Sequence, residues 1–294
     1  MTQPLPKADP PVATPTQPKA ALPENACDTH VHMVGGPDDF PLWDGRVEDP
    51  ADGSFDQWIG RLEHHLDTLQ MARVVIVHSI LYGGDNRVTM ESVRRLGRDR
   101  ARGIALLRDG APEANLDALA EAGAAGIRLN YVHGGLLSWE GAVEMSPRLA
   151  ARGMHLQMLM FAHEHADDLY SAVRALPVPV VFDHIGWPDL SLGVETPGFQ
   201  TLCRMVAEGH AYVKLSGLYR VCDAPYTEAE AHVRALVAAN PERCLWGSDW
   251  PHIMLADAKR PDAGVLLNAF LDTVPEADIR QQILSANPET LYGF

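Results

Sequence analysis

The chain has 294 residues, of which 46% are hydrophobic, and its 39 aspartates and glutamates outnumber its 24 lysines and arginines, giving a formal net charge of −15. This composition indicates a globular protein rather than a disordered one, and its acidity argues against nucleic acid as a partner. No stretch approaches the roughly eighteen consecutive apolar residues of a membrane-spanning helix, so no membrane partner is expected.

The four cysteines, Cys27, Cys203, Cys222 and Cys244, are spread along the chain and form no C-x-x-C pair. This usage is typical of a reduced, intracellular protein. We therefore expect a cytoplasmic location, without a structural zinc site or a disulfide framework.

The first segment, residues 1–24, is rich in proline and lacks the apolar core of a signal peptide. Such a composition predicts an extended tail. Two interpretations stay open: a disordered leader, or a segment that lies along the domain or against a neighbouring subunit of a homo-oligomer. Residues 25–294 are expected to form one domain.

Beyond the tail, short apolar runs alternate with longer amphipathic stretches. The runs that we predict as strands are residues 27–33, 73–79, 102–107, 125–130, 154–160, 179–185, 211–217 and 243–249. Helical periodicity is clearest over residues 86–100, 112–123, 165–176 and 229–240. Strands that alternate with helices predict a parallel sheet, and eight of them predict an α/β domain folded as a (β/α)8 TIM barrel. The alternative is an open doubly wound sheet, but no G-x-G-x-x-G follows an early strand.

The first predicted strand carries two histidines, His30 and His32, within ACDTHVHMVG. Alternate residues of a strand share a face, so both imidazoles and the Asp28 carboxylate point the same way. Burying this much polarity is costly unless each group finds a hydrogen-bond partner, a ligand or a metal.

In a TIM barrel the carboxyl ends of the strands converge on the active site. The polar residues that the sequence places at or near those ends are His30, His32, His78, Ser79, Arg128, Asn130, Asp183, His184, Lys214, Ser216 and Asp249. A single buried histidine is usually a satisfied core residue, whereas three histidines and an aspartate at one end of a barrel indicate a catalytic site. A barrel that only binds a ligand is the non-enzymatic alternative, and it gives no reason for a base opposite three imidazoles.

The pattern of His-x-His on the first strand, His184 on the sixth and Asp249 on the eighth resembles the metal site of the amidohydrolase superfamily. The resemblance covers essentially residues 25–294. The stretches DTHVHMVG, GIRLN, VVFDHIGWPD, LWGSDWPH and ANPETLYGF are similar to the lactonase branch typified by 2-pyrone-4,6-dicarboxylate lactonase.

The resemblance implies a hydrolase that opens the lactone ring of a small organic acid in aromatic- or sugar-acid catabolism. It implies that Asp249 is the general base that activates water, and that His30, His32 and His184 face and polarise the carbonyl. The side chains that we expect to bind the substrate are Arg128, Arg220, Tyr82, Asn130, Trp187 and His252.

Two departures from the dicarboxylate lactonase affect the substrate. That pattern has a further arginine in the loop after the fourth strand and another three residues after the sixth-strand histidine. This chain reads NYVHGGL in that loop and has Trp187 at the second position. Losing two cations weakens the case for a dicarboxylate and favours a monoacid or a hydroxylated lactone.

The metal requirement and the reaction both have alternatives. We expect no obligatory metal, because the fourth strand offers Arg128 where many metal-dependent relatives have a bridging ligand. The alternative is one zinc ion held by His30, His32, His184 and Asp249. The resemblance also leaves open a lactone isomerase of the galactarolactone type and a zinc-dependent sulfomuconolactone-type hydrolase or decarboxylase.

Overall fold

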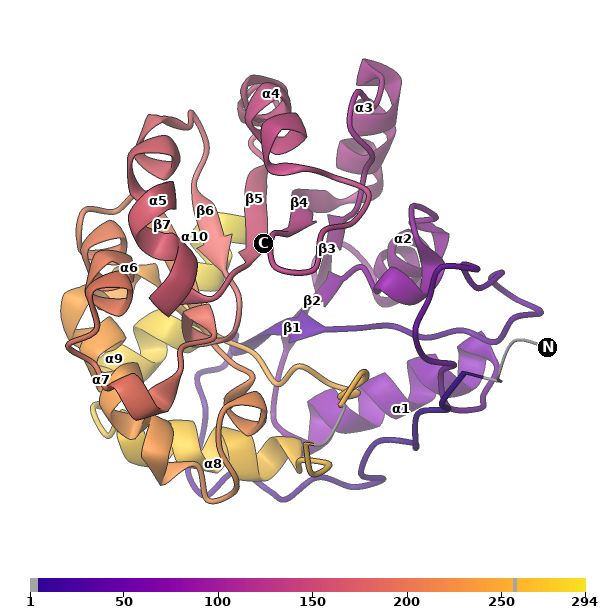
Figure 1. The fold of residues 1–294 in the computed structure, drawn as a ribbon. Helices are drawn as coiled ribbons and strands as arrows, with labels where there is room; N and C mark the ends of the chain where they lie inside the picture. The colour runs from indigo at the N-terminus through magenta and orange to yellow at the C-terminus, as the bar shows by residue number, and fades with distance from the viewer. Residues whose placement is uncertain (1–4, 256–257) are drawn as a thin grey trace.

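The computed structural model describes residues 5–255 and 258–294, and Figure 1 shows a ring of helices around a central sheet. The eight strands are parallel and follow one another around the sheet in chain order. Their bounds are β1 (Cys27–Val31), β2 (Arg73–Val77), β3 (Ala101–Ala105), β4 (Ala124–Asn130), β5 (His155–Leu159), β6 (Val180–Phe182), β7 (Ala211–Leu215) and β8 (Cys244–Trp246). The predicted TIM barrel is confirmed.

Most of the strands end earlier than predicted, because the chain leaves the sheet to form the mouth of the barrel. The sixth strand stops at Phe182, and His184 begins a short 3-10 turn. The eighth stops at Trp246, and Asp249 lies in the loop beyond it. These candidate site residues therefore belong to the connections at the carboxyl ends of the strands, where barrel enzymes carry their catalytic groups.

Hydrogen bonds between β1 and the segment after β8 complete the ring. The Asp249 amide donates to the carbonyl of His30 at 2.8 Å, and the His32 amide donates to the carbonyl of Trp250 at 2.7 Å. Gly247 permits this approach, since a Cβ there would lie 2.6 Å from the Cβ of His30. The last strand thus lies against the first with Asp249 beside the two histidines.

The helices that cover the barrel bury their apolar faces against the strands. Those of the repeating units are α1 (Phe55–Thr68), α2 (Arg87–Leu96), α3 (Glu113–Ala122), α4 (Trp139–Ala150), α5 (Ala162–Ala175), α6 (Pro197–Ala207), α7 (Glu230–Ala239) and α8 (Ala263–Thr273). The chain closes with α9 (Ala277–Gln281) and α10 (Asn287–Tyr292). The four stretches with helical periodicity correspond to α2, α3, α5 and α7. Helix α1 begins with a capping box, in which the side chains of Ser54 and Gln57 each accept a hydrogen bond from the other residue's backbone amide.

The described part of the predicted tail, residues 5–24, runs along the outside of the barrel past α1 and α8 (Figure 1). The amide of Thr16 donates to the carboxylate of Asp262 at 3.0 Å, and its hydroxyl does so at 2.8 Å. A Cβ at Gly264 would lie 1.7 Å from the carbonyl oxygen of Thr16, so the tail packs closely on the start of α8. Residues 1–4 of the tail lie outside the described residues, and contact with a neighbouring subunit stays a prediction.

Within residues 5–255 and 258–294, the structure contains no helix that is long and apolar enough to cross a lipid bilayer.

Candidate active site

A pocket of about 540 Å³ opens at the carboxyl ends of the strands. Seven of the predicted site residues line it: they are His32, Arg128, Asn130, His184, Trp187, Arg220 and Asp249. The remaining wall is largely apolar and comes mainly from the loops after β1 and β4, with Ile80, Leu106, Leu159 and Met254 added from other strand ends and loops. Its position over the barrel mouth matches that of the active sites of TIM-barrel enzymes.

At the floor of this pocket the structure brings Asp249 together with the three predicted histidines. The Oδ1 atom of Asp249 lies 3.3 Å from Nε2 of His32 and 3.5 Å from Nε2 of His30. Nε2 of His184 lies 3.7 Å from the other oxygen, Oδ2. All four side chains are buried, and residues from β1, from the position just after it and from the connections after β6 and β8 form one cluster.

The backbone at two of these residues is strained in a way that aims them inward. His184 has φ of 55° and Asp249 has φ of 62°, both in the left-handed region that non-glycine residues rarely occupy. Such a conformation costs roughly 1–3 kcal/mol and persists where the surrounding structure enforces it, often at functional sites.

The two histidines of the first strand region differ in their Nδ1 contacts, and the hydrogen bond of His32 determines which of its ring nitrogens carries the proton. Nδ1 of His32 lies 2.8 Å from the carbonyl of Val77, which can only accept, so Nδ1 donates. Nδ1 of His30 lies 3.2 Å from Oδ1 of Asp183 and 3.4 Å from Nζ of Lys214. Burial, against the opposing charge of Asp183, holds the pKa of His30 well below its usual value and keeps the ring neutral. The Nε2 atoms of both rings face Oδ1 of Asp249.

The second oxygen of Asp249 is held by two donors. The hydroxyl of Tyr219 donates to Oδ2 at 2.6 Å, and Nε of Arg220 donates to the same atom at 2.9 Å. Burial alone would raise the pKa of this carboxyl group, but Arg220 and His184 hold it well below its usual range. Burial and the Asp249 charge raise the pKa of Tyr219 well above its usual value, so Tyr219 keeps its proton and donates. Asp249 is therefore ionised, and its Oδ1 atom faces the histidines.

His184 differs from the other two histidines in its partner. Its Nδ1 lies 3.0 Å from the hydroxyl of Ser216, a group that can donate as well as accept. When Ser216 donates, the proton of the neutral ring sits on Nε2. Burial, against the nearby Asp249 charge, lowers the pKa of His184 to about 4, so the ring is neutral at neutral pH. His184 is thus the imidazole of this cluster that can offer an N–H to the pocket.

Beneath the histidines lies a buried network around Asp183. The ammonium group of Lys214 donates to the carbonyl of Thr29 at 2.8 Å and to Oε1 of Gln157 at 2.7 Å, and lies 3.8 Å from Asp183 Oδ1. Burial lowers the pKa of Lys214 to about 8, with Asp183 opposing the shift. This network fixes the carboxylate that orients His30, an arrangement typical of groups behind a catalytic histidine.

Arg128 reaches the pocket from the end of β4. Its Nη1 donates to the carbonyl of His78 at 2.8 Å, and its Nη2 lies 3.9 Å from Asp183 Oδ2. Burial lowers its pKa, with Asp183 opposing the shift, but a guanidinium group stays charged at neutral pH. Close by, Oδ1 of Asn130 accepts from the amide of His133 at 2.9 Å, so the Asn130 side chain also holds the following loop.

Two predicted substrate-binding residues lie outside this pocket lining. The hydroxyl of Tyr82 donates to the carbonyl of Gly35 at 2.8 Å and accepts from the Gly35 amide at 2.7 Å, which ties the loop after β2 to that after β1. His252 is buried, and its Nε2 lies 3.1 Å from the carbonyl of Ser248. Sequence reasoning missed Tyr219, because a tyrosine beside Arg220 carries no signal that it will bond to Asp249.

The site also contains a donor set that fits a metal ion. His30, His32 and Asp249 offer ligand atoms that all lie within 4.8 Å of one another. Nε2 of His30 and Oδ1 of Asp249 are buried and have no hydrogen-bond partner in the described part of the chain. Two imidazole nitrogens and a carboxylate oxygen are ligands that zinc prefers, and three acceptors facing one another call for a cation or a shared proton. The expectation of a site without metal does not account for these unpartnered atoms.

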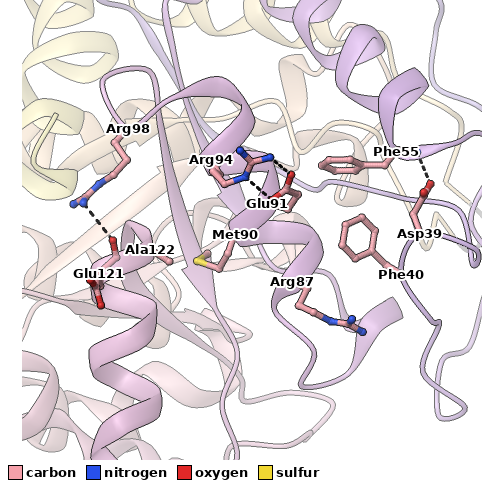
Figure 2. A pocket seen from close by; sticks show the side chains of 10 residues that line it. All are labelled: Asp39, Phe40, Phe55, Arg87, Met90, Glu91, Arg94, Arg98, Glu121 and Ala122. Atoms are coloured by element: carbon pink, nitrogen blue, oxygen red, sulfur yellow. Dashed lines mark hydrogen bonds and ion pairs between the residues drawn. The ribbon is translucent and has the colours of Figure 1, made fainter.

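A second and larger hollow, of about 740 Å³, lies on the outside of the barrel (Figure 2). We call it the outer groove, and it is lined by Asp39, Phe40, Phe55, Arg87, Met90, Glu91, Arg94, Arg98, Glu121 and Ala122. Nε of Arg94 donates to Glu91 at 2.7 Å, and the Asp39 carboxylate accepts from the amide of Phe55 at 2.8 Å. None of the three histidines or Asp249 lines this groove.

Known proteins resemble the chain over almost its whole length. It is 31% identical over 294 residues to a 2-pyrone-4,6-dicarboxylate hydrolase from Comamonas testosteroni, covering 95% of this chain and 94% of the relative. It is 31% identical over 290 residues to a 4-sulfomuconolactone hydrolase from Hydrogenophaga intermedia, covering 92% and 90%. An apo crystal structure from Agrobacterium tumefaciens superposes with a TM-score of 0.80 at 25% identity, over 96% of this chain and 99% of the other.

The family model described as amidohydrolase matches residues 27–294. The match begins with β1, which carries His30 and is followed directly by His32, and it includes the loop that carries Asp249. The resemblance that the sequence motifs predict is thereby confirmed: the chain belongs to the amidohydrolase family.

Proposed function

We propose that the chain hydrolyses the ring ester of a lactone of a small organic acid. The observation that carries the proposal is the ionised Asp249, whose Oδ1 has no hydrogen-bond partner among the described residues and faces imidazoles at the floor of a pocket. The two relatives described above, both named as hydrolases of lactone rings, support the same reaction class.

In this proposal Asp249 is the general base. Its Oδ1 takes a proton from a water molecule as the water oxygen attacks the carbonyl carbon of the lactone. Tyr219 and Arg220 hold Oδ2 and so fix the direction of Oδ1. When the ring C–O bond breaks, the proton passes from Asp249 to the leaving oxygen, and the product is the open-chain hydroxy acid or its keto form.

His184 stabilises the charge that develops on the carbonyl oxygen. With Ser216 donating to its Nδ1, its Nε2–H points into the pocket as an oxyanion donor. Removing one such donor typically lowers the rate by about 10²–10³-fold. Arg128 binds a carboxylate of the substrate and orients the ring over Asp249.

His30, His32 and Asp249 are the residues that would hold one zinc ion. When bound, zinc would polarise the carbonyl and lower the pKa of water. The Val77 carbonyl keeps the Nδ1 proton of His32 in place and so leaves its Nε2 as a ligand atom, and Nε2 of His30 has no hydrogen-bond partner among the described residues.

The test is a panel of pyrones, muconolactones and aldonolactones, with turnover followed by acid release in a pH-stat and by proton NMR. Hydrolysis releases one proton per ring opened and yields the open-chain acid. A new lactone without acid release would indicate isomerisation, and released carbon dioxide would indicate decarboxylation. Either of those outcomes, or an absence of turnover across the panel, contradicts the proposal.

A further inference from the structure

We infer that the substrate carries one carboxylate and an apolar substituent, rather than two anionic groups or several hydroxyls. The inference rests on the proposed function and concerns the same pocket. It follows from which charges of the pocket are already paired and from the chemistry of its walls.

Two of the residues that line the pocket are permanently cationic, Arg128 and Arg220. The Arg220 guanidinium is already engaged, since its Nε and Nη2 both lie 2.9 Å from Oδ2 of Asp249. Its Nη groups also donate to the carbonyls of Ile253 and Met254 at 3.2 and 3.3 Å. Turning it toward a substrate would leave these acceptors with fewer donors, so Arg220 neutralises Asp249 rather than the ligand.

Arg128 is differently placed. Its one hydrogen bond among the described residues runs from Nη1 to the carbonyl of His78, and the Asp183 carboxylate lies 3.9 Å from Nη2. Several of its five N–H donors therefore stay free to face the pocket. One guanidinium with free donors can bind one carboxylate in a bidentate manner, and no second cation of the lining is free for another.

The walls of the pocket are suited to hydrocarbon. The apolar side chains that line it include Ile80, Leu106, Leu136, Leu137, Leu159 and Met254. Neutral polar side chains in the lining are few, and Asn130 has already used its carbonyl oxygen on the amide of His133. A ligand with several hydroxyls would exchange bonds to water for contacts with leucines, which is unfavourable.

The rim of the pocket extends the apolar surface outward. Val47, which belongs to the lining, is 64% exposed and is the most exposed large hydrophobic residue of the described chain. An apolar substituent on the lactone would cover it. The volume of about 540 Å³ lies within the range of small-molecule sites and leaves room for a ring together with such a substituent.

The first experiment measures binding of unreactive acids to the purified full chain by calorimetry. The probes are 4-propylbenzoate (one carboxylate and an alkyl chain), isophthalate (two carboxylates) and gluconate (one carboxylate and five hydroxyls). We expect 4-propylbenzoate to bind at least about tenfold more tightly than either of the others, a difference of about 1.4 kcal/mol. Equal or tighter binding of isophthalate or gluconate, or no binding of 4-propylbenzoate at millimolar concentration, would overturn the inference.

The second experiment adds a charge to the apolar wall. Leu136→Arg places a second guanidinium in the loop after β4, and Leu136→Gln is the matched neutral control. We expect Leu136→Arg to bind isophthalate at least about tenfold more tightly than wild type, with little change in Leu136→Gln. An equal gain in both variants would contradict the charge argument. Because these readouts are binding, they stand apart from the lactone panel, whose failure would overturn the proposed reaction instead.

Discussion

The outer groove in Figure 2 has a volume of about 740 Å³, and the pocket at the barrel mouth has about 540 Å³. The groove contains more charged side chains, but they lie at the surface and pair with near neighbours, as Arg94 does with Glu91 on the same helix. At the mouth, Asp249 and His30 are fully buried, and each has a polar atom without a hydrogen-bond partner in residues 5–255 and 258–294. The two hollows therefore differ in how their charges are satisfied.

This difference indicates where chemistry takes place. A surface ion pair contributes little to stability and is formed or lost easily, so its presence beside a hollow carries little functional meaning. A buried carboxylate facing buried imidazoles is costly to maintain, and proteins tend to keep such groups where they act on a ligand. For this reason the pocket at the barrel mouth is the better candidate for the active site, although its volume is the smaller of the two.

The largest effect in a test of this comparison is expected from Asp249→Asn. The amide has nearly the same shape but cannot accept a proton from water, so turnover of the best lactone should fall by about 10²–10⁴-fold. Steady-state kinetics measure the loss, and circular dichroism with thermal unfolding serves as the control for folding. Turnover close to that of wild type would remove Asp249 from the mechanism.

Removal of a metal should have the next largest effect. If the three convergent acceptors hold zinc, protein purified without chelator should contain about one ion per chain. Dialysis against a chelator should then lower both activity and the thermal unfolding midpoint, because the ion stabilises the folded state to which it binds. Elemental analysis and calorimetry provide these readouts. Full activity in protein with no bound metal would contradict this prediction. It would support the expectation from the sequence, where Arg128 takes the place of a bridging ligand on the fourth strand.

The sequence predicts the architecture and most of this cluster. Alternation of apolar runs and helical stretches is enough for the barrel, and the rule that strand ends converge then joins His30 to Asp249 across more than two hundred residues. The tautomer of His32 was not predictable, because its partner is a backbone carbonyl of β2, and such an atom has no signature in the side-chain pattern. The sequence likewise predicts Arg220 as a substrate-binding residue, whereas in the structure its guanidinium group pairs with Asp249.

Tyr82 and His252 illustrate the same limit. Both follow strands closely in sequence, which favours a place in the mouth. Yet Tyr82 bonds to a backbone carbonyl of the loop after β1, and His252 to one of its own loop after β8. Loop conformation decides whether a polar residue near a strand end faces the ligand or supports the loop, and periodicity does not report on it.

A smaller effect is expected at the opposite end of the barrel, where β5 begins with the buried His155. Burial, together with the Lys214 charge, lowers its pKa to about 3, against about 6.5 in the unfolded chain. Because the folded pKa is the lower one, the contribution of this histidine to stability is complete above about pH 6.5 and is lost as the pH falls toward 3. Neither ring nitrogen of His155 has a hydrogen-bond partner among the described residues, but it lines neither hollow.

Urea unfolding between about pH 6 and pH 4 tests this assignment. The free energy of unfolding of the wild type should fall more steeply with decreasing pH than that of His155→Gln, by about 1 kcal/mol per pH unit. The slope is the readout, since the substitution itself also changes packing and hence the absolute stability. Parallel slopes would show that His155 does not titrate on unfolding. Lactone turnover at neutral pH should change little in a folded His155→Gln, in contrast to Asp249→Asn.

The smallest effect is expected in the outer groove, from Arg94→Gln. The side chain of Arg94 is 69% exposed, and its partner Glu91 lies one helical turn away, so removing the pair leaves no buried group unsatisfied. Lactone turnover should stay within about twofold of wild type, since surface substitutions away from a site rarely alter it. A loss comparable to that of Asp249→Asn would mean that the groove takes part in the reaction. It would also contradict the argument that buried, unpartnered polar atoms mark the active site. Unchanged turnover in Arg94→Gln is informative only together with a large loss in Asp249→Asn. The two variants then compare a paired surface charge with a buried charge in the same fold.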